Sequence, residues 1–210
     1  MALPILVSVP HAGLRVPPEV ASACLLTRDQ IVEDGDAHAT EIFDFAGDVA
    51  EHVTTDVARA IVDLNRAEDD RRPDGVVKSH TCFNAPVYAE PPSDATVERL
   101  LERYYRPYHA RLTDLAGRGV RVGVDCHTML AVGPPIGPDP GLERPRVCLS
   151  HADGTCPPAW IERLRDCFTA EFGDAVTIND PFTGGHITRT HARELPWVHL
   201  LDEQPPGGDE

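Results

Sequence analysis

Two histidines of this chain stand just after short apolar runs, where a strand would deliver them to the edge of a sheet. His11 follows residues 5–9, and His127 follows residues 120–124 with Asp125 between. Neutral imidazole is a common zinc ligand, and Asp125 is placed to accept the other ring N–H of His127 and fix its tautomer. A lone histidine after a strand is more often structural, but each of these two strengthens the case for the other. The pair predicts a metal site.

Zinc hydrolases usually hold the ion with three protein ligands and a water, so a third ligand is needed. The stretch 33–38 offers several, of which Asp36 is the first choice and His38 the next. A solvated acidic start of a helix would explain the same residues, because carboxylates favour the positive end of the helix dipole. We expect one Zn²⁺ per chain on His11, Asp36 and His127, since the softness and geometry of these ligands favour zinc.

A third apolar run, residues 60–62, leads into Asp63-Leu64-Asn65-Arg66. The planar, always charged guanidinium of Arg66 beside the amide of Asn65 matches a carboxylate, although an ion pair with nearby acids is the alternative. Arg189 follows paired glycines, where Gly185 would allow close backbone approach to a ligand, and a simple tight turn explains the glycines equally well. These residues predict a small anionic substrate.

A zinc-activated water still needs a base to take its proton. The last predicted strand, residues 196–201, is followed by Asp202 and Glu203, and the sequence leaves the choice between them open. Cys126 is a poor nucleophile for this chemistry, because adjacent residues of a strand point to opposite faces and His127 would lie on the other side.

Strands alternate with helices along the chain, which is typical of an α/β fold with a mainly parallel or mixed sheet. In such a sheet ligands bind beyond the carboxyl ends of the strands. The apolar patterns predict strands at 5–9, 57–62, 120–125, 146–150, 175–179 and 196–201, and helices at 38–51, about 95–117 and from Pro157-Pro158 to Gly173. Pro107 is expected to kink or split the second helix.

Length and charge set the remaining expectations. The chain has 210 residues and a formal net charge of -15, and no composition shift divides it. We expect a single domain over 1–203, a flexible acidic Pro/Gly tail over 204–210, and no nucleic-acid partner, because no basic stripe exists. No stretch is long and apolar enough for a membrane span and no signal peptide is recognisable, so a cytoplasmic protein is expected. The oligomeric state stays open.

Five blocks in order resemble the N-formylglutamate amidohydrolase family. They are Ser8-Val9-Pro10-His11-Ala12-Gly13, Ile61-Val62-Asp63-Leu64-Asn65-Arg66, Tyr105-Arg106-Pro107-Tyr108-His109, Asp125-Cys126-His127-Thr128 and Gly184-Gly185-His186-Ile187-Thr188-Arg189. The resemblance implies a phosphorylase/hydrolase-like three-layer α/β/α sandwich around a mixed, mainly parallel sheet. It also implies zinc-dependent hydrolysis of N-formyl-L-glutamate to formate and L-glutamate, a late step of histidine degradation, with Asn65 and Arg66 on one substrate carboxylate.

The same resemblance implies a glutamate as general base in a C-terminal Gln-Leu-Glu. This chain reads His199-Leu200-Leu201-Asp202-Glu203, and a strict alignment places Leu201 at the glutamate. Glu203 or Asp202 then takes the role, and Arg189 holds the second carboxylate. Two alternatives remain: hydrolysis of another N-acyl amino acid or small amide, and a non-catalytic carboxylate-binding protein that has lost its base.

Overall fold

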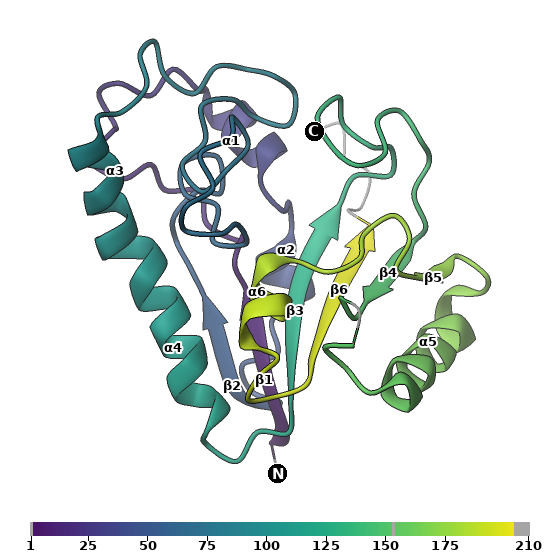
Figure 1. Cartoon of the computed structure of the whole chain (residues 1–210). Coiled ribbons are helices and arrows are strands. Elements are labelled where there is room, and N and C mark those ends of the chain that lie inside the picture. The colour runs from purple at the N-terminus through teal and green to yellow at the C-terminus, as the bar shows by residue number, and fades with distance from the viewer. Residues whose placement is uncertain (1, 153, 204–210) are drawn as a thin grey trace.

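Six strands form one sheet in a computed structural model that describes residues 2–152 and 154–203 (Figure 1). The predicted tail at 204–210 lies outside the described residues. The strands are β1 (Leu3–Val9), β2 (Val49–Thr54), β3 (Val122–Met129), β4 (Val147–Ser150), β5 (Val176–Ile178) and β6 (Trp197–Glu203). In the order β2-β1-β3-β6-β4-β5, only the pair β4 and β6 is antiparallel among these described strands. The predicted mixed, mainly parallel sheet is confirmed.

Helices cover both faces of this sheet, which makes three layers. They are α1 (Arg28–Asp34), α2 (Ala39–Ile42), α3 (Asp94–Leu100), α4 (Arg106–Ala116), α5 (Pro158–Phe172) and α6 (His186–His191). Alternate residues of β6 show the two faces: Trp197 packs with α4 and α6, whereas Val198 and Leu200 pack with α5. The α/β/α sandwich is therefore confirmed.

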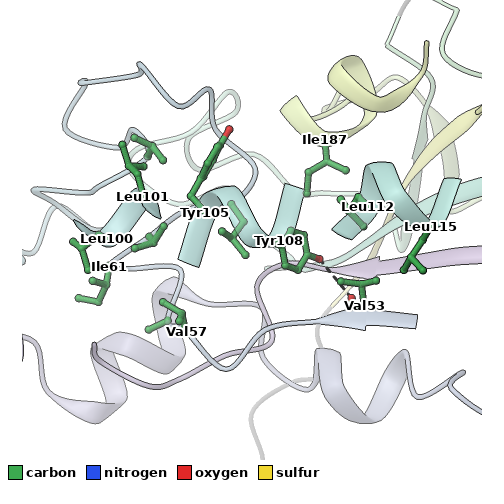
Figure 2. Packing of buried hydrophobic residues seen from close by; sticks show 14 of the residues in the cluster. Val53, Val57, Ile61, Leu100, Leu101, Tyr105, Tyr108, Leu112, Leu115 and Ile187 are labelled. Atoms are coloured by element: carbon green, nitrogen blue, oxygen red, sulfur yellow. Dashed lines mark hydrogen bonds between the residues drawn. The ribbon is translucent and has the colours of Figure 1, made fainter. Parts of the chain in front are cut away.

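The long helical segment that packs on β1 and β2 begins at the predicted residue, and a π-helical turn interrupts it just before Pro107. Ser93 caps α3 by accepting a hydrogen bond from the backbone N–H of Thr96. A π-helical turn, η1 (Leu101–Tyr105), joins α3 to α4, and Pro107 lies in the first turn of α4, where its missing N–H costs least. Figure 2 shows the packing of this segment, in which Tyr108 donates a hydrogen bond to the carbonyl of Val53.

Two predicted elements are wrong in the same part of the chain. The strand predicted at 57–62 is a series of turns, in which the N–H groups of Ile61 and Val62 both bond to the carbonyl of Ala58. Its side chains are buried under α3 and α4 rather than within the sheet, so the apolar run reflects burial and not a strand. The helix predicted at 38–51 shrinks to α2, because the following residues turn at Phe45 and then form the edge strand β2.

The strand predicted at 120–125 extends to Met129, since its pairing with β6 continues to that residue. Asp125, His127 and Met129 therefore lie inside a strand and share one face of it. On that face the hydroxyl of Ser8, which belongs to β1, donates a hydrogen bond to the carboxylate of Asp125. No helix in the described part of the chain has the length and apolar character that a membrane crossing requires.

Candidate metal centre

His11, Asp36 and His127 converge at the carboxyl-terminal edge of the sheet, as predicted. Nδ1 of His127 lies 2.9 Å from Oδ2 of Asp36 and 3.0 Å from Nδ1 of His11. Nδ1 of His11 lies 3.5 Å from the same Asp36 oxygen, and all three residues are buried. His38, the other predicted third ligand, is exposed at the start of α2. Two imidazole nitrogens and a carboxylate oxygen are a donor set that fits a divalent ion such as zinc.

Local structure places Asp36 in this centre. Thr27 and Gln30 form a capping box at the start of α1, and the N–H of Gly35 closes its last turn on Ile31 and Val32. The chain then turns toward β1, and the backbone N–H of Thr128 donates a hydrogen bond of 3.2 Å to Asp36 Oδ2. The carboxylate is therefore aimed from a helix end onto the ends of two strands.

Each of the two histidines is held from behind by an aspartate. Nε2 of His127 lies 3.0 Å from Oδ2 of Asp125, the partner that the sequence predicts, and Nε2 of His11 lies 2.8 Å from Oδ1 of Asp63. Such carboxylates fix the ring orientation and tautomer of metal-binding histidines. Because both Nε2 atoms are occupied, both Nδ1 atoms are left to face the centre.

Charges inside the cluster shift its protonation. Burial alone would lower the pKa of His127, but Asp125 and Asp36 outweigh it and raise the pKa to about 10. Burial would raise the pKa of Asp36, yet the neighbouring His11 and His127 hold it well below its ordinary value. Without a metal, the ionised Asp36 therefore faces a protonated His127. A bound cation would replace the proton of His127.

Two cations, the partly exposed Arg59 and the buried Lys78, balance the carboxylates around the centre. Nε of Arg59 lies 3.3 Å from Asp63, and its Nη1 lies 3.4 Å from Asp36. Lys78 is almost fully buried and lies 2.9 Å from Asp34 and 4.0 Å from Asp63. Neither cation was predicted from the sequence, because both stand in segments without regular secondary structure.

Asn65 and Gly185 meet beside His127. The side-chain amide nitrogen of Asn65 donates to Asp125 at 3.2 Å and lies 3.1 Å from Nε2 of His127, while its oxygen accepts from the N–H of Ile187. A Cβ at Gly185 would lie 2.3 Å from that amide nitrogen, so the glycine allows α6 to begin against Asn65. In this structure Asn65 therefore positions the histidine and its aspartate.

A cavity of about 490 Å³ opens over the triad and is lined by all three of its residues. Arg66 also lines it: its Nε donates to the carbonyl of Asp74, and its Nη1 and Nη2 lie 3.7 Å and 3.8 Å from the carboxylates of Asp63 and Asp74, beyond hydrogen-bond distance. Arg189 is exposed on α6, bonds to Thr183, and is not among the described residues that line the cavity.

The side of the cavity toward β6 and β4 is apolar. Leu201 pairs with His127 across the β3–β6 register and packs with Met129 and Phe182. We call the apolar side chains that line this side the apolar wall; they are Met129, Phe182 and Leu201.

The two predicted base candidates lie at the carboxyl end of β6, one and two residues beyond Leu201, the register partner of His127. Asp202 and Glu203 are 3.2 Å and 3.6 Å from the guanidinium of Arg146, and neither is among the described residues that line the cavity. Burial raises the pKa of Asp202.

The β6 residue that does reach the centre is His199, which was not predicted from the sequence. Its ring packs on His127, burial lowers its pKa to about 3, and its buried Nδ1 has no hydrogen-bond partner among the described residues.

Comparisons with known proteins agree on one family. The family model described as N-formylglutamate amidohydrolase matches residues 3–201. A protein of Pseudomonas putida named N-formylglutamate deformylase is 30% identical over 95% of this chain and 78% of its own length. The protein of that name from Pseudomonas aeruginosa is 29% identical over 97% of this chain and 84% of its own. A crystal structure of N-formylglutamate amidohydrolase from Ralstonia eutropha JMP134 superposes with a TM-score of 0.79 at 23% identity, covering 97% of this chain and 82% of that one.

Proposed function

The chain belongs to the N-formylglutamate amidohydrolase family, and on that premise we propose that it is a metal-dependent hydrolase of an N-acyl amino acid. N-formyl-L-glutamate, cleaved to formate and L-glutamate, is the first substrate to test, because two relatives are named for its deformylation. One observation carries the proposal: the buried triad of His11, Asp36 and His127, with an aspartate behind each histidine.

The triad would hold the ion, and zinc is the metal that its ligand types favour. A bound zinc ion supplies a water of lowered pKa and polarises the carbonyl of the scissile amide. Asp63 and Asp125 would fix the tautomer of the two histidines and orient their Nδ1 atoms toward the ion. Arg59 balances Asp36 and Asp63, so that the buried carboxylates do not repel one another.

Arg66 is the proposed partner of the substrate carboxylate. Its guanidinium lines the cavity. The Asp74 carboxylate, 3.8 Å from Nη2, is too distant to accept a hydrogen bond, so the N–H groups of Nη2 can donate to a substrate. A carboxylate held there would fix the substrate next to the triad, and such positioning contributes much of the rate of an enzyme. Asn65 supports this site indirectly, through Asp125 and His127.

Glu203 is the proposed proton acceptor. Alternate residues of a strand share a face, so Glu203 lies on the same face of β6 as His199 and Leu201, whereas Asp202 lies on the opposite one. Loss of a general base costs about 10²–10⁴ in rate. We expect that loss in Glu203→Gln and a much smaller one in Asp202→Asn. If both variants keep the wild-type kcat, neither carboxylate takes the proton.

Formate release from N-formyl-L-glutamate, measured before and after chelation, tests the proposal. Activity that disappears with the chelator and returns with zinc supports it. A folded, zinc-loaded protein that hydrolyses neither this compound nor the N-formyl, N-acetyl and N-carbamoyl derivatives of other amino acids would contradict it. Tight carboxylate binding in that same protein would then indicate a binding protein without catalysis.

A further inference from the structure

The cavity over the triad has two chemically different sides. The side toward β1 carries guanidinium groups from the segment after β2, Arg59 and Arg66. The side toward β6 and β4 carries the apolar wall. The strand order is β2-β1-β3-β6-β4-β5 (Figure 1). The triad lies between the two sides, because His11 follows β1 and His127 belongs to β3. A ligand bound across the triad therefore meets charge at one end and hydrocarbon at the other.

The charged side offers one place for a carboxylate among the cavity-lining arginines described. Arg144 is almost fully buried and makes two hydrogen bonds of 2.7 Å to Asp139. Arg72 is bound by Asp70 through two nitrogens. Arg59 is shared by Asp36 and Asp63. Arg66 is the most loosely held of the four: its Nε and Nη1 donate to the carbonyls of Asp74 and Asn65, and the carboxylates of Asp63 and Asp74, at 3.7 Å and 3.8 Å, are beyond hydrogen-bond distance.

The apolar side lies directly against the centre. Leu201 is the register partner of His127, and Met129 follows His127 on the same face of β3. Phe182 packs against both, while the guanidinium of Arg144 stacks on its ring at 4.9 Å with its charge already paired to Asp139. Leu201 and Met129 are buried and belong to the strands β6 and β3, which fixes the position of these two wall residues.

Resting on the function proposed above, the geometry points to an N-acyl amino acid whose acyl group is an apolar chain longer than formyl. The two substituents of an amide extend to opposite sides of its carbonyl carbon. With the amino-acid carboxylate on Arg66 and the carbonyl at the triad, the acyl group reaches the apolar wall. A formyl group, which carries only hydrogen, leaves that wall without contact, and buried hydrocarbon there favours a longer chain.

Hydrolysis by the zinc-loaded protein of N-formyl-, N-acetyl- and N-butanoyl-L-alanine, beside N-formyl-L-glutamate, tests this assignment. We expect kcat/KM to rise roughly fourfold per added carbon of the acyl chain, which is the value of burying one methylene. Binding of the same compounds to the metal-free protein, measured by calorimetry, should follow the same order. A second series with a fixed acetyl group and alanine, leucine or glutamate as the amino acid separates the acyl chain from the side chain.

Leu201→Ala and Leu200→Ala form a matched pair of variants. Leu201 belongs to the apolar wall, whereas Leu200 is on the opposite face of β6 in the other core cluster. Leu201→Ala should lower kcat/KM for the butanoyl compound by about tenfold and change that for N-formyl substrates less than about twofold. Leu200→Ala should leave the ratio between the two substrates unchanged, even if it lowers the Tm.

The outcomes separate this inference from the function on which it rests. Fastest hydrolysis of N-formyl compounds, or a rate set only by the amino-acid side chain, overturns the acyl assignment and leaves the hydrolase intact. No hydrolysis of any compound overturns the hydrolase. Calorimetric affinities that still rise with acyl length, and fall in Leu201→Ala, would in that case support the apolar wall as a binding site alone.

Discussion

Asp63 Oδ1 lies 2.8 Å from Nε2 of His11, so that Nδ1 of His11 faces Asp36 and His127. Asp63 is fully buried, and Arg59 and Arg66 lie on its other oxygen. The same relationship holds between Asp125 and His127. The centre thus depends on residues that would not touch the ion, and this dependence can be measured.

Asp63→Asn should weaken metal binding. The amide keeps the shape of the side chain but loses the charge that orients His11, and loss of such a partner typically costs 10–100-fold in metal affinity. Competition with a chromophoric chelator gives the affinity. Asp56→Asn removes one charge from a surface pair with Arg15 and is the matched control. Equal affinities in the two variants would show that Asp63 does not support the centre.

Arg66→Lys should raise KM by roughly 10–100-fold with a smaller change in kcat, because lysine lacks the planar fork that binds a carboxylate at two points. Steady-state kinetics with N-acyl amino acids measures this. Arg103→Lys, in a surface pair with Glu19, is the control. An unchanged KM in Arg66→Lys would remove Arg66 from substrate binding.

Gly185→Ala should disturb the centre from the side of α6. Its Cβ would lie 2.3 Å from the amide nitrogen of Asn65, which bonds to Asp125. Such overpacking typically costs about 1–3 kcal/mol, and we expect a lower Tm together with weaker metal binding. Gly117→Ala is the control, because nothing lies within 4 Å of a Cβ there. Identical behaviour of the two variants would contradict the close contact.

Stability should fall on acidification through a histidine pair between α4 and α6. Nδ1 of His109 lies 3.0 Å from Nε2 of His191, and burial together with His191 lowers the pKa of His109 from 6.5 to about 4. Between these values the unfolded chain binds the proton and the folded chain does not, so the free energy of unfolding decreases as the pH falls. The loss from His109 between about pH 7.5 and about pH 5 is at most ~2 kcal/mol.

Urea unfolding at the two pH values measures this loss. His109→Gln should show a weaker pH dependence than the wild type, while the exposed His38→Gln should retain it. A wild-type slope in His109→Gln would show that this pair does not set the acid sensitivity.

The sequence predicted the parts of the centre whose residue types carry their own chemistry. His11 and His127 follow predicted strands, Asp36 supplies the third ligand that such a site needs from the acidic stretch 33–38, and the structure brings the three together. Asp125 was predicted because a carboxylate two residues before a metal-binding histidine can accept its other ring N–H.

The remaining parts depend on tertiary structure. Asp63 reaches His11 from a turn that the apolar pattern of 57–62 predicted as a strand, because burial without alternation does not reveal the backbone path. Lys78 pairs with Asp34 from an irregular loop, and the sequence of that loop has no periodicity from which the burial of Lys78 could be predicted. Gly184-Gly185 was consistent with a turn, and the helix α6 that follows carries Arg189 on its exposed side. His199 could have been found from its alternation with Leu201.

Metal stoichiometry is the most direct test of the central claim. Elemental analysis of the protein after zinc supplementation and removal of free ions should give about one zinc per chain. The His127→Ala variant, if folded by circular dichroism, should give none, because His127 also belongs to the second possible group with Asp125 and His199. A folded wild-type protein that binds no divalent ion under these conditions would contradict the account of His11, Asp36 and His127.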